Sequence, residues 1–301
     1  MRDPDENTNY GGRSVGVLLG PQSPGDLSLA SGALIQGDRF MRTTLLAAFL
    51  AGFAGVTSFA TEIVAHRGAS QLAPENTLAA FKLAWEQGAD ACEMDLRLSS
   101  DGEIVVIHDQ DTRRTTGVSS VVAQTSLVNL QQLSARAGKG DAYASERIPT
   151  LAQALAVLPP GKRYFLEIKC GPEILPVLER QLAAWKPNAA QIAIITFDPD
   201  LARRCKATLP WFKVYRLSSG EDKHRRRVGI DQLIAEAKRD GLDGLHLSRS
   251  LPWPQFAKVR AAGLELYVWT VNDRDTLGYF STTAIDGITT DNPLLAREAL
   301  K

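Results

Sequence analysis

The chain has 301 residues, 44% of them hydrophobic, so it is long enough to bury a large core. Its 34 Lys and Arg residues balance its 34 Asp and Glu residues, which excludes the strongly basic surface of a protein that binds nucleic acid through overall charge. We therefore expect no nucleic-acid partner and only local recognition of charge. The cysteines Cys92, Cys170 and Cys205 lack C-x-x-C spacing, and we expect all three to be structural.

The first 60 residues differ in composition from the rest. Residues 1–40 are polar and lack apolar periodicity, which predicts a disordered extension or a start site placed too early. Residues 41–60 combine a basic start, an apolar run and small residues before Thr61, a pattern typical of a secretory signal peptide. We expect translation from Met41 and a periplasmic or secreted domain of residues 61–301 with no stable membrane span after cleavage. An uncleaved anchor that leaves the domain outside is the alternative.

Apolar strand-like runs alternate with amphipathic helix-like runs from residue 61 onward. Helices are expected between the strands, for instance over 77–87, with Asn76 as N-cap and Gly88 as its stop, and over 230–239. Such alternation is typical of a parallel α/β fold, and eight strands with following helices predict a (β/α)₈ TIM barrel. The strand candidates are residues 62–66, 90–96, 163–169, 191–196, 213–217, 243–247, 265–271 and 285–289.

A ninth apolar run, residues 104–109, would break that count. The Asp-Gly pair at 101–102 is a hairpin signal, which predicts that this run returns antiparallel beside the second strand. Folding symmetrically about the turn places Asp95 opposite His108. Residues 110–149 then form an insertion over the active face, and its segment TSLVNLQQLSA is expected to contain a short helix.

Charged residues gather where the first three barrel strands are expected to end. Period-two alternation places Glu93 and Asp95 on one face of a strand, and Glu167 with Lys169 on one face of the next. Crowded carboxylates have raised pKa values unless a cation binds, and ligands that are all oxygen favour Mg²⁺ or Ca²⁺. Together with Arg67 and a dication, these groups leave one positive charge, which a phosphodiester would neutralise. A salt-bridged polar layer without metal is the alternative.

The histidines suggest acid/base chemistry. His66 and His108 could serve as a pair, one taking a proton from the attacking oxygen and the other donating one to the leaving oxygen of a phosphate ester. His246 could contact the substrate or support the structure, and Trp269 could cap a small polyol or fill the core. His224 lies in the charged run EDKHRRR, for which a solvated loop is favoured over a phosphate or lipid-headgroup patch.

Short motifs occur in a consistent order along the chain. They are HRG (66–68), PENT (74–77), Glu-x-Asp (93–95), DG (101–102), HD (108–109), RTTG (114–117), IPTL (148–151), LEIK (166–169), WTVN (269–272) and DGITTDNP (286–293). Over about residues 63–293 the chain resembles the glycerophosphodiester phosphodiesterase family. The resemblance implies a TIM barrel with residues 110–149 as the family insertion, and hydrolysis of glycerophosphodiesters to glycerol 3-phosphate and an alcohol.

The resemblance also implies a role for each site residue. The substrate would be a small-molecule glycerophosphodiester, held by a divalent metal ion and Arg67 while one histidine deprotonates the glycerol 2-hydroxyl or a water and the other protonates the departing alkoxide. Trp269 is a further candidate for substrate binding. Thr196 stands where the family more often has Ser, and it keeps the hydroxyl. The implied roles are acid/base catalysis for His66 and His108, metal binding for Glu93, Asp95 and Glu167, and phosphate binding for Arg67 and Lys169.

Three other functions are weighed against this one. A phospholipase D-like or sphingomyelinase-like enzyme acting on intact lipids would favour an exposed apolar rim on the insertion, where the segment GDAYASER is polar. A secreted protein that only binds glycerophosphodiesters would need no acid/base pair. A purely structural barrel would not require three carboxylates at its mouth.

Overall fold

The computed structural model describes residues 61–300 except 137, 186–187 and 223. The predicted extension of residues 1–40 and the predicted signal peptide of residues 41–60 lie outside the described residues. Within the described part of the chain, none of the helices combines the length and the apolar character needed to span a bilayer.

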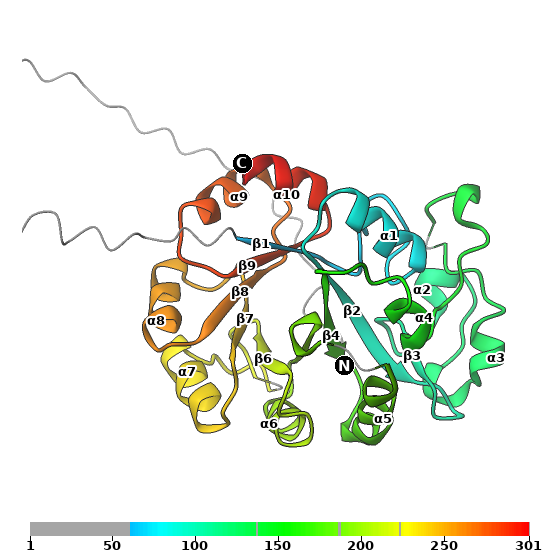
Figure 1. Cartoon of the computed structure of the whole chain (residues 1–301), viewed down its shortest axis with the longest axis horizontal. Helices are drawn as coiled ribbons and strands as arrows, with labels where there is room; N and C mark the ends of the chain where they lie inside the picture. The colour runs from blue at the N-terminus through cyan, green and yellow to red at the C-terminus, as the bar shows by residue number, and fades with distance from the viewer. Residues whose placement is uncertain (1–60, 137, 186–187, 223, 301) are drawn as a thin grey trace, which may run out of the picture. The chain divides into compact units, whose positions relative to one another are not determined.

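Eight parallel strands close into a barrel (Figure 1). Strand β1 (Glu62–Ala65) pairs with both β2 (Ala91–Leu98) and β9 (Gly287–Thr290), which joins the two ends of the sheet. This closure confirms the predicted TIM barrel, and every predicted barrel strand overlaps an observed one. The other parallel strands are β4 (Arg163–Ile168), β5 (Ile192–Thr196), β6 (Lys213–Ser218), β7 (Gly244–Ser248) and β8 (Glu265–Trp269).

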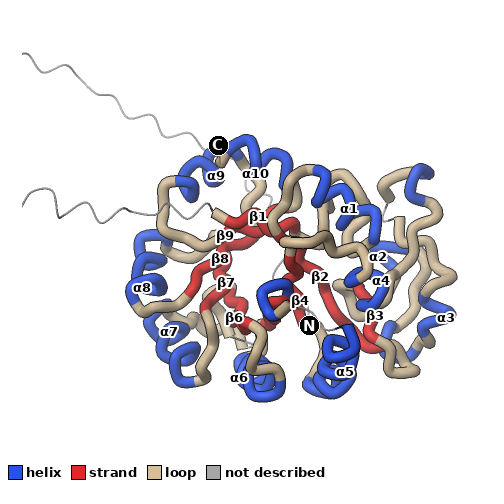
Figure 2. The backbone as a smooth tube through the Cα atoms, viewed as in Figure 1, coloured by secondary structure: helices blue, strands red, loops and turns tan. Residues whose placement is uncertain are grey.

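Helices surround the barrel on its outside (Figure 2). The helix predicted over 230–239 is confirmed with those bounds. The helices are α1 (Leu78–Glu86), α2 (Arg113–Thr116), α3 (Leu127–Leu130), α4 (Leu151–Leu155), α5 (Leu175–Trp185), α6 (Pro199–Thr208), α7 (Ile230–Arg239), α8 (Phe256–Ala261), α9 (Arg274–Ser281) and α10 (Pro293–Ala299). Short 3₁₀ turns occur at Val122–Gln124, Asp141–Tyr143, Pro172–Ile174, Ala189–Gln191 and Trp253–Gln255.

The two faces of the barrel strands contribute to separate cores, because successive side chains of a strand point to opposite sides. Cys92 and Met94 of β2 and Leu166 of β4 pack with the helices, as the alternation predicts. Inside the barrel, Phe165 and Tyr215 belong to a second cluster whose rings contact one another. This inner cluster consists of Val64, Ala91, Phe165, Ala193, Ile195, Tyr215, Leu217, Tyr267 and Trp269.

Helix α1 begins one residue later than predicted, and Asn76 is not its N-cap. Thr77 caps the helix, because its side-chain oxygen accepts a hydrogen bond from the amide of Ala80. Asn76 has a backbone φ of 58°, in the left-handed region that asparagine tolerates better than most residues. Its side chain donates through Nδ2 to Oδ2 of Asp95 at 2.6 Å. Asn76 therefore binds one of the predicted metal ligands and does not cap the helix.

The hairpin of β2 and β3 (Ile104–Val106) is antiparallel as predicted, but its register differs by one residue. Leu96 pairs with Val106, and the amide of Ile107 donates to the carbonyl of Asp95, so Asp95 lies opposite Ile107 and not His108. The loop has three residues and ends on Gly102 at a φ of 78°, whereas the prediction assumed a two-residue turn. One extra loop residue shifts the partner of every residue by one.

The insertion of residues 110–149 packs on the hairpin through a small apolar core of its own. The short helix predicted within TSLVNLQQLSA is confirmed as α3. The buried residues of this core are Val105, Ile107, Val122, Leu130, Ala135 and Ile148.

Candidate active site

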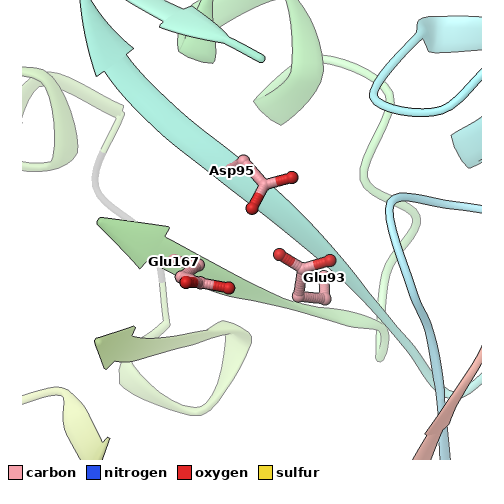
Figure 3. Close-up of side chains that lie close together, drawn as sticks. All are labelled: Glu93, Asp95 and Glu167. Carbon is pink, nitrogen blue, oxygen red and sulfur yellow. The ribbon is translucent and has the colours of Figure 1, made fainter. Parts of the chain in front are cut away.

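Three buried carboxylates converge near the carboxyl ends of two neighbouring strands. Glu93 and Asp95 lie on one face of β2, and Glu167 projects toward them from β4 (Figure 3). Asp95 and Glu167 are direct neighbours across the parallel ladder. One oxygen of each residue lies within 4.8 Å of the others. The cluster predicted from period-two alternation is therefore present.

The pKa values of the three carboxyl groups are shifted in different directions. Burial and the charges of the two neighbouring carboxylates raise the pKa of Glu93 well above its usual range. Burial also raises the pKa of Glu167, although Lys169 opposes this rise. Asp95 shows the opposite shift, because Arg67, His108 and Lys169 outweigh the effect of burial and lower its pKa. The predicted rise in pKa is thus seen for Glu93 and Glu167, and the prediction is wrong for Asp95.

Arg67 and Lys169 both contact the carboxylates. The Arg67 amide donates to Oε2 of Glu93 at 2.9 Å, and its Nε lies 3.3 Å from Oδ2 of Asp95. The Lys169 ammonium lies 2.7 Å from Oε1 of Glu167 and 3.6 Å from Oδ1 of Asp95. Both cations are almost fully buried, so their charges act on the cluster with little solvent screening.

The donor set fits a hard divalent cation. Oε1 of Glu93 is buried and has no hydrogen-bond partner within the described residues. A buried carboxylate oxygen without a partner is costly, and a cation that accepts oxygen ligands would satisfy it. Glu93, Asp95 and Glu167 together could therefore hold a metal ion.

His66 follows directly after β1 and is oriented by a residue from the other end of the chain. Its Nδ1 lies 2.7 Å from Oδ1 of Asp291. Asp291 also accepts hydrogen bonds from Ser70 at 3.1 Å and from Asn272 at 2.5 Å. These hydrogen bonds and the charge of His66 outweigh burial and lower the pKa of Asp291. The ionised carboxylate can only accept, so Nδ1 of His66 is the protonated nitrogen.

His108 is oriented in the same way from the hairpin. Its Nδ1 lies 2.7 Å from Oδ1 of Asp109, and its own carbonyl accepts a 2.8 Å hydrogen bond from Arg97 of β2. Arg97 also donates to the carbonyl of Lys169 at 2.8 Å, which links the hairpin to the end of β4. Although His108 does not pair with Asp95, its charge still acts on both Asp95 and Glu167.

Comparison with known proteins decides the family. The chain matches the glycerophosphoryl diester phosphodiesterase family over residues 66–295, which is most of its length and includes every residue of the candidate site described above. It belongs to this family. Its members are phosphoric diester hydrolases.

Individual members of the family are similar to the chain over nearly their whole length. A glycerophosphodiester phosphodiesterase of Caldanaerobacter subterraneus subsp. tengcongensis is 34% identical over 240 residues, which cover 77% of this chain and 95% of the relative. A phosphodiesterase of Oleispira antarctica, solved in complex with the product sn-glycerol-3-phosphate, is 29% identical with a TM-score of 0.73 and coverage of 81% of this chain and 98% of that one. A Thermotoga maritima glycerophosphodiester phosphodiesterase is 26% identical with a TM-score of 0.66, and the match covers 79% of this chain and 97% of that one.

Two other predicted residues line the barrel interior of this family member. His246 is fully buried, its Nε2 lies 2.8 Å from Oγ1 of Thr289, and burial lowers its pKa to about 3. Trp269 donates through Nε1 to the carbonyl of His246 at 3.0 Å and packs edge-on against Phe197. These contacts favour the structural alternative for His246, whereas substrate binding by Trp269 stays a prediction. His224 lies exposed in its charged loop, which fits the solvated alternative.

Sequence reasoning missed the residues that orient the catalytic candidates. Asp291, Asp109 and Asn76 stand inside the quoted motifs DGITTDNP, HD and PENT, so their positions were noted without their partners. The local sequence does not distinguish a carboxylate that binds a histidine from a carboxylate that caps a helix. Only the adjacency of Asp109 and His108 offered a signal.

Proposed function

We propose that this chain hydrolyses glycerophosphodiesters to glycerol 3-phosphate and an alcohol, using His66 and His108 as its acid/base pair. The observation that carries the proposal is the pair of carboxylate-oriented histidines beside a buried carboxylate cluster. Membership of the family and the similarity to a phosphodiesterase that binds sn-glycerol-3-phosphate support the choice of substrate.

Each histidine uses Nδ1 to bind a carboxylate, so proton exchange with the substrate is assigned to Nε2. The carboxylate holds the ring in one tautomer and stabilises the imidazolium that forms when Nε2 takes a proton. With one ring neutral and the other protonated, one serves as base toward the attacking hydroxyl and the other as acid toward the leaving alkoxide. Asp291 and Asp109 are therefore positioning residues in this mechanism.

Binding of the phosphodiester is assigned to Arg67 and Lys169. A guanidinium can bind two phosphate oxygens at once, and an ammonium adds a compact charge. Glu93, Asp95 and Glu167 would hold Ca²⁺ or Mg²⁺, which when bound supplies positive charge to a phosphate oxygen. When all three carboxylates are ionised and no cation is bound, these five groups carry a net negative charge, which opposes binding of an anionic substrate.

The proposal is tested by measuring glycerol 3-phosphate release from a panel of glycerophosphodiesters, with and without added divalent cation. His66→Ala and His108→Ala should each lower kcat by about two to four orders of magnitude. His224→Ala, at an exposed histidine of the charged loop, is the control and should leave kcat unchanged. Full activity in both active-site variants would refute the assignment, and substrate binding without turnover by the wild type would favour the binding-protein alternative.

Exposed valines on the insertion favour a second candidate, an enzyme that acts on intact lipids in the manner of a phospholipase D or a sphingomyelinase. Val118, Val121 and Val128 are 50%, 44% and 67% exposed. Such side chains could contact acyl chains at a lipid surface. Faster turnover of phosphatidylcholine in mixed micelles than of soluble glycerophosphocholine would support this candidate, and the reverse order would support the first.

We also propose that the domain is exported, on the basis of the composition of residues 41–60. N-terminal sequencing of protein recovered from outside the cytoplasm should begin at Thr61. An uncleaved N-terminus with the domain outside would indicate a signal anchor, and protein retained in the cytoplasm would contradict export.

A further inference from the structure

Arg114, on helix α2 of the insertion, binds two carboxylates at once. Its Nη1 and Nη2 donate to the two oxygens of Glu75 at 2.5 and 2.8 Å. Its Nε and Nη2 donate to the two oxygens of Asp109 at 2.7 and 3.1 Å. Each carboxylate is therefore bound through both of its oxygens, a planar arrangement that only a guanidinium can provide.

The Asp109 contact leads to the proposed acid/base pair. Oδ1 of Asp109 lies 2.7 Å from Nδ1 of His108 and also accepts from Arg114. Burial alone would raise the pKa of Asp109, but the hydrogen bonds from His108 and Arg114 outweigh it and lower the pKa. Arg114 thus helps to keep Asp109 ionised and correctly oriented as the acceptor for His108.

The Glu75 contact leads to the proposed phosphate binder. Oε1 of Glu75 accepts from Nη1 of Arg67 at 3.1 Å as well as from Arg114. Without Arg114, the carboxylate of Glu75 would have Arg67 as its main cationic partner, and a tighter ion pair would draw the guanidinium away from a substrate phosphate. Sharing Glu75 between two arginines keeps that attraction moderate.

We propose that Arg114 is a positioning residue of the active site, which sets the orientation of His108 through Asp109 and that of Arg67 through Glu75. This role rests on the proposed function of those two residues. It also gives the insertion a part in the reaction, since α2 contributes a side chain that touches both Asp109, which supports His108, and Glu75, which supports Arg67.

The exposure of Arg114 separates this role from a purely structural one. Its side chain is 42% exposed, so solvent screens its ion pairs and their contribution to folding stability is small. A small error in the orientation of a catalytic group, in contrast, has a large effect on turnover. Removal of Arg114 should therefore change activity much more than stability.

The test compares Arg114→Gln with Arg113→Gln. Arg113 is its neighbour on the same helix, is exposed, and has no side-chain hydrogen bond or ion pair among the described residues. Arg114→Gln should lower kcat/KM by about 10- to 100-fold, the usual effect of losing a residue that orients a functional group, with little change in the thermal midpoint. Arg113→Gln should match the wild type. Arg114→Lys keeps the charge but not the planar fork, so it should restore only part of the activity, and full activity in this variant would contradict the argument.

Double-mutant cycles separate the effect of the Asp109 contact from that of the Glu75 contact. In an Asp109→Asn background, Arg114→Gln should have little further effect on kcat, because the link to His108 is already broken. In a Glu75→Gln background, it should have little further effect on KM. Fully additive losses in both cycles would overturn the proposal. If Arg114→Gln fails to fold, the same cycles are measured with Arg114→Lys.

Failure of this inference is distinguishable from failure of the proposed function. A wild-type protein that releases no glycerol 3-phosphate from any glycerophosphodiester contradicts the proposed function. An active wild type whose Arg114→Gln variant is as active as Arg113→Gln contradicts only the role of Arg114.

Discussion

The two histidines of the site depend on acidic residues that differ greatly in sequence distance. Asp109 is adjacent to His108, whereas Asp291 is 225 residues away from His66. In both cases the carboxylate selects the tautomer, because an ionised carboxylate can only accept a hydrogen bond, so the ring nitrogen that faces it must carry the proton. The acceptor side chain is thus as important as the ring that it holds.

Asp291→Asn tests this dependence. The amide can donate to Nδ1 and so favours the opposite tautomer of neutral His66, which places the proton on Nε2 and leaves that nitrogen unable to accept one. The amide also fails to stabilise the imidazolium. We expect kcat to fall by about 10- to 100-fold with a smaller change in KM. Steady-state kinetics measure both constants. Ser70→Ala removes only one of the other hydrogen bonds to Asp291 and should have a much smaller effect; equal losses in the two variants would argue against control of the tautomer.

The burial of His246 predicts how the free energy of unfolding depends on pH. Its pKa is about 3 in the folded protein because the ring is fully buried, whereas an unfolded histidine titrates near 6.5. Between these values the unfolded chain binds one more proton, so the free energy of unfolding falls as the pH falls through this window. His246→Gln keeps a hydrogen-bonding group toward Thr289 but cannot titrate. The unfolding free energy of this variant should therefore depend less steeply on pH, by up to about 1.4 kcal/mol per pH unit.

Urea unfolding at several pH values between 4 and 7 measures this difference. His224→Gln is the matched control, since that ring is exposed to solvent in the folded protein and in the unfolded chain. Its curve should run parallel to that of the wild type. A parallel curve for His246→Gln as well would show that His246 is not held neutral by burial.

At the scale of elements, the turn from β1 into α1 positions Arg67 and packs the first helix close to its strand. Gly68 has a φ of 82°, and a Cβ atom there would lie 2.6 to 2.7 Å from the backbone and Cβ of Ala80. Neither a shifted backbone nor a rotated side chain can relieve such a contact cheaply, because the obstacle is the helix itself. The HRG motif thus combines two residues of the proposed active site with a glycine required for packing.

Gly68→Ala and Gly102→Ala form a matched pair. Both glycines have left-handed φ values, but a Cβ at Gly102 would meet nothing within 4 Å. Gly102→Ala should cost about 1 kcal/mol of stability from backbone strain alone. Gly68→Ala should cost about 2 to 5 kcal/mol, because overpacking adds to the strain, and should also lower kcat/KM by displacing Arg67. Chemical denaturation measures the two costs, and similar values would contradict the importance of the contact with Ala80.

At the scale of the whole molecule, closure of the barrel places charged groups from the start, middle and end of the chain around one mouth. Buried carboxylates that repel one another destabilise the fold that brings them together. A cation bound only by the folded protein offsets this repulsion and shifts the folding equilibrium by mass action. Substrate binding and folding stability should therefore both depend on the same ion.

Thermal unfolding of protein treated with chelator, with and without Ca²⁺, tests this coupling. Saturation at about 100 times the dissociation constant should stabilise the wild type by about 2.7 kcal/mol and raise its melting temperature. Glu93→Gln removes one ligand charge, so it should stabilise the metal-free protein and lose most of the response to Ca²⁺. Glu179→Gln, on the exposed side of α5, should respond like the wild type. An undiminished response in Glu93→Gln would place the cation elsewhere.

The amino-acid sequence by itself determined the barrel, the hairpin and the carboxylate cluster. These features depend on patterns within a few residues: period-two alternation puts Glu93 and Asp95 on one face of a strand, and turn residues separate the strands. His66, Arg67 and Lys169 were predicted for the site because they stand at the ends of barrel strands, which meet at one mouth in any barrel of this kind. His108 was predicted for it because the hairpin returns the chain to the same mouth.

The tertiary structure alone decided which residues touch across the mouth. Because the hairpin loop has one residue more than expected, Asp95 lies opposite Ile107 and not His108. Asn76, which was expected to cap a helix, instead donates a hydrogen bond to the carboxylate of Asp95. The pairing of Asp291 with His66 exists because β9 lies beside β1, a contact created by barrel closure. Arg114 joins two carboxylates that are far apart in sequence. Local patterns carry no information on such contacts, since they arise only when distant segments pack together.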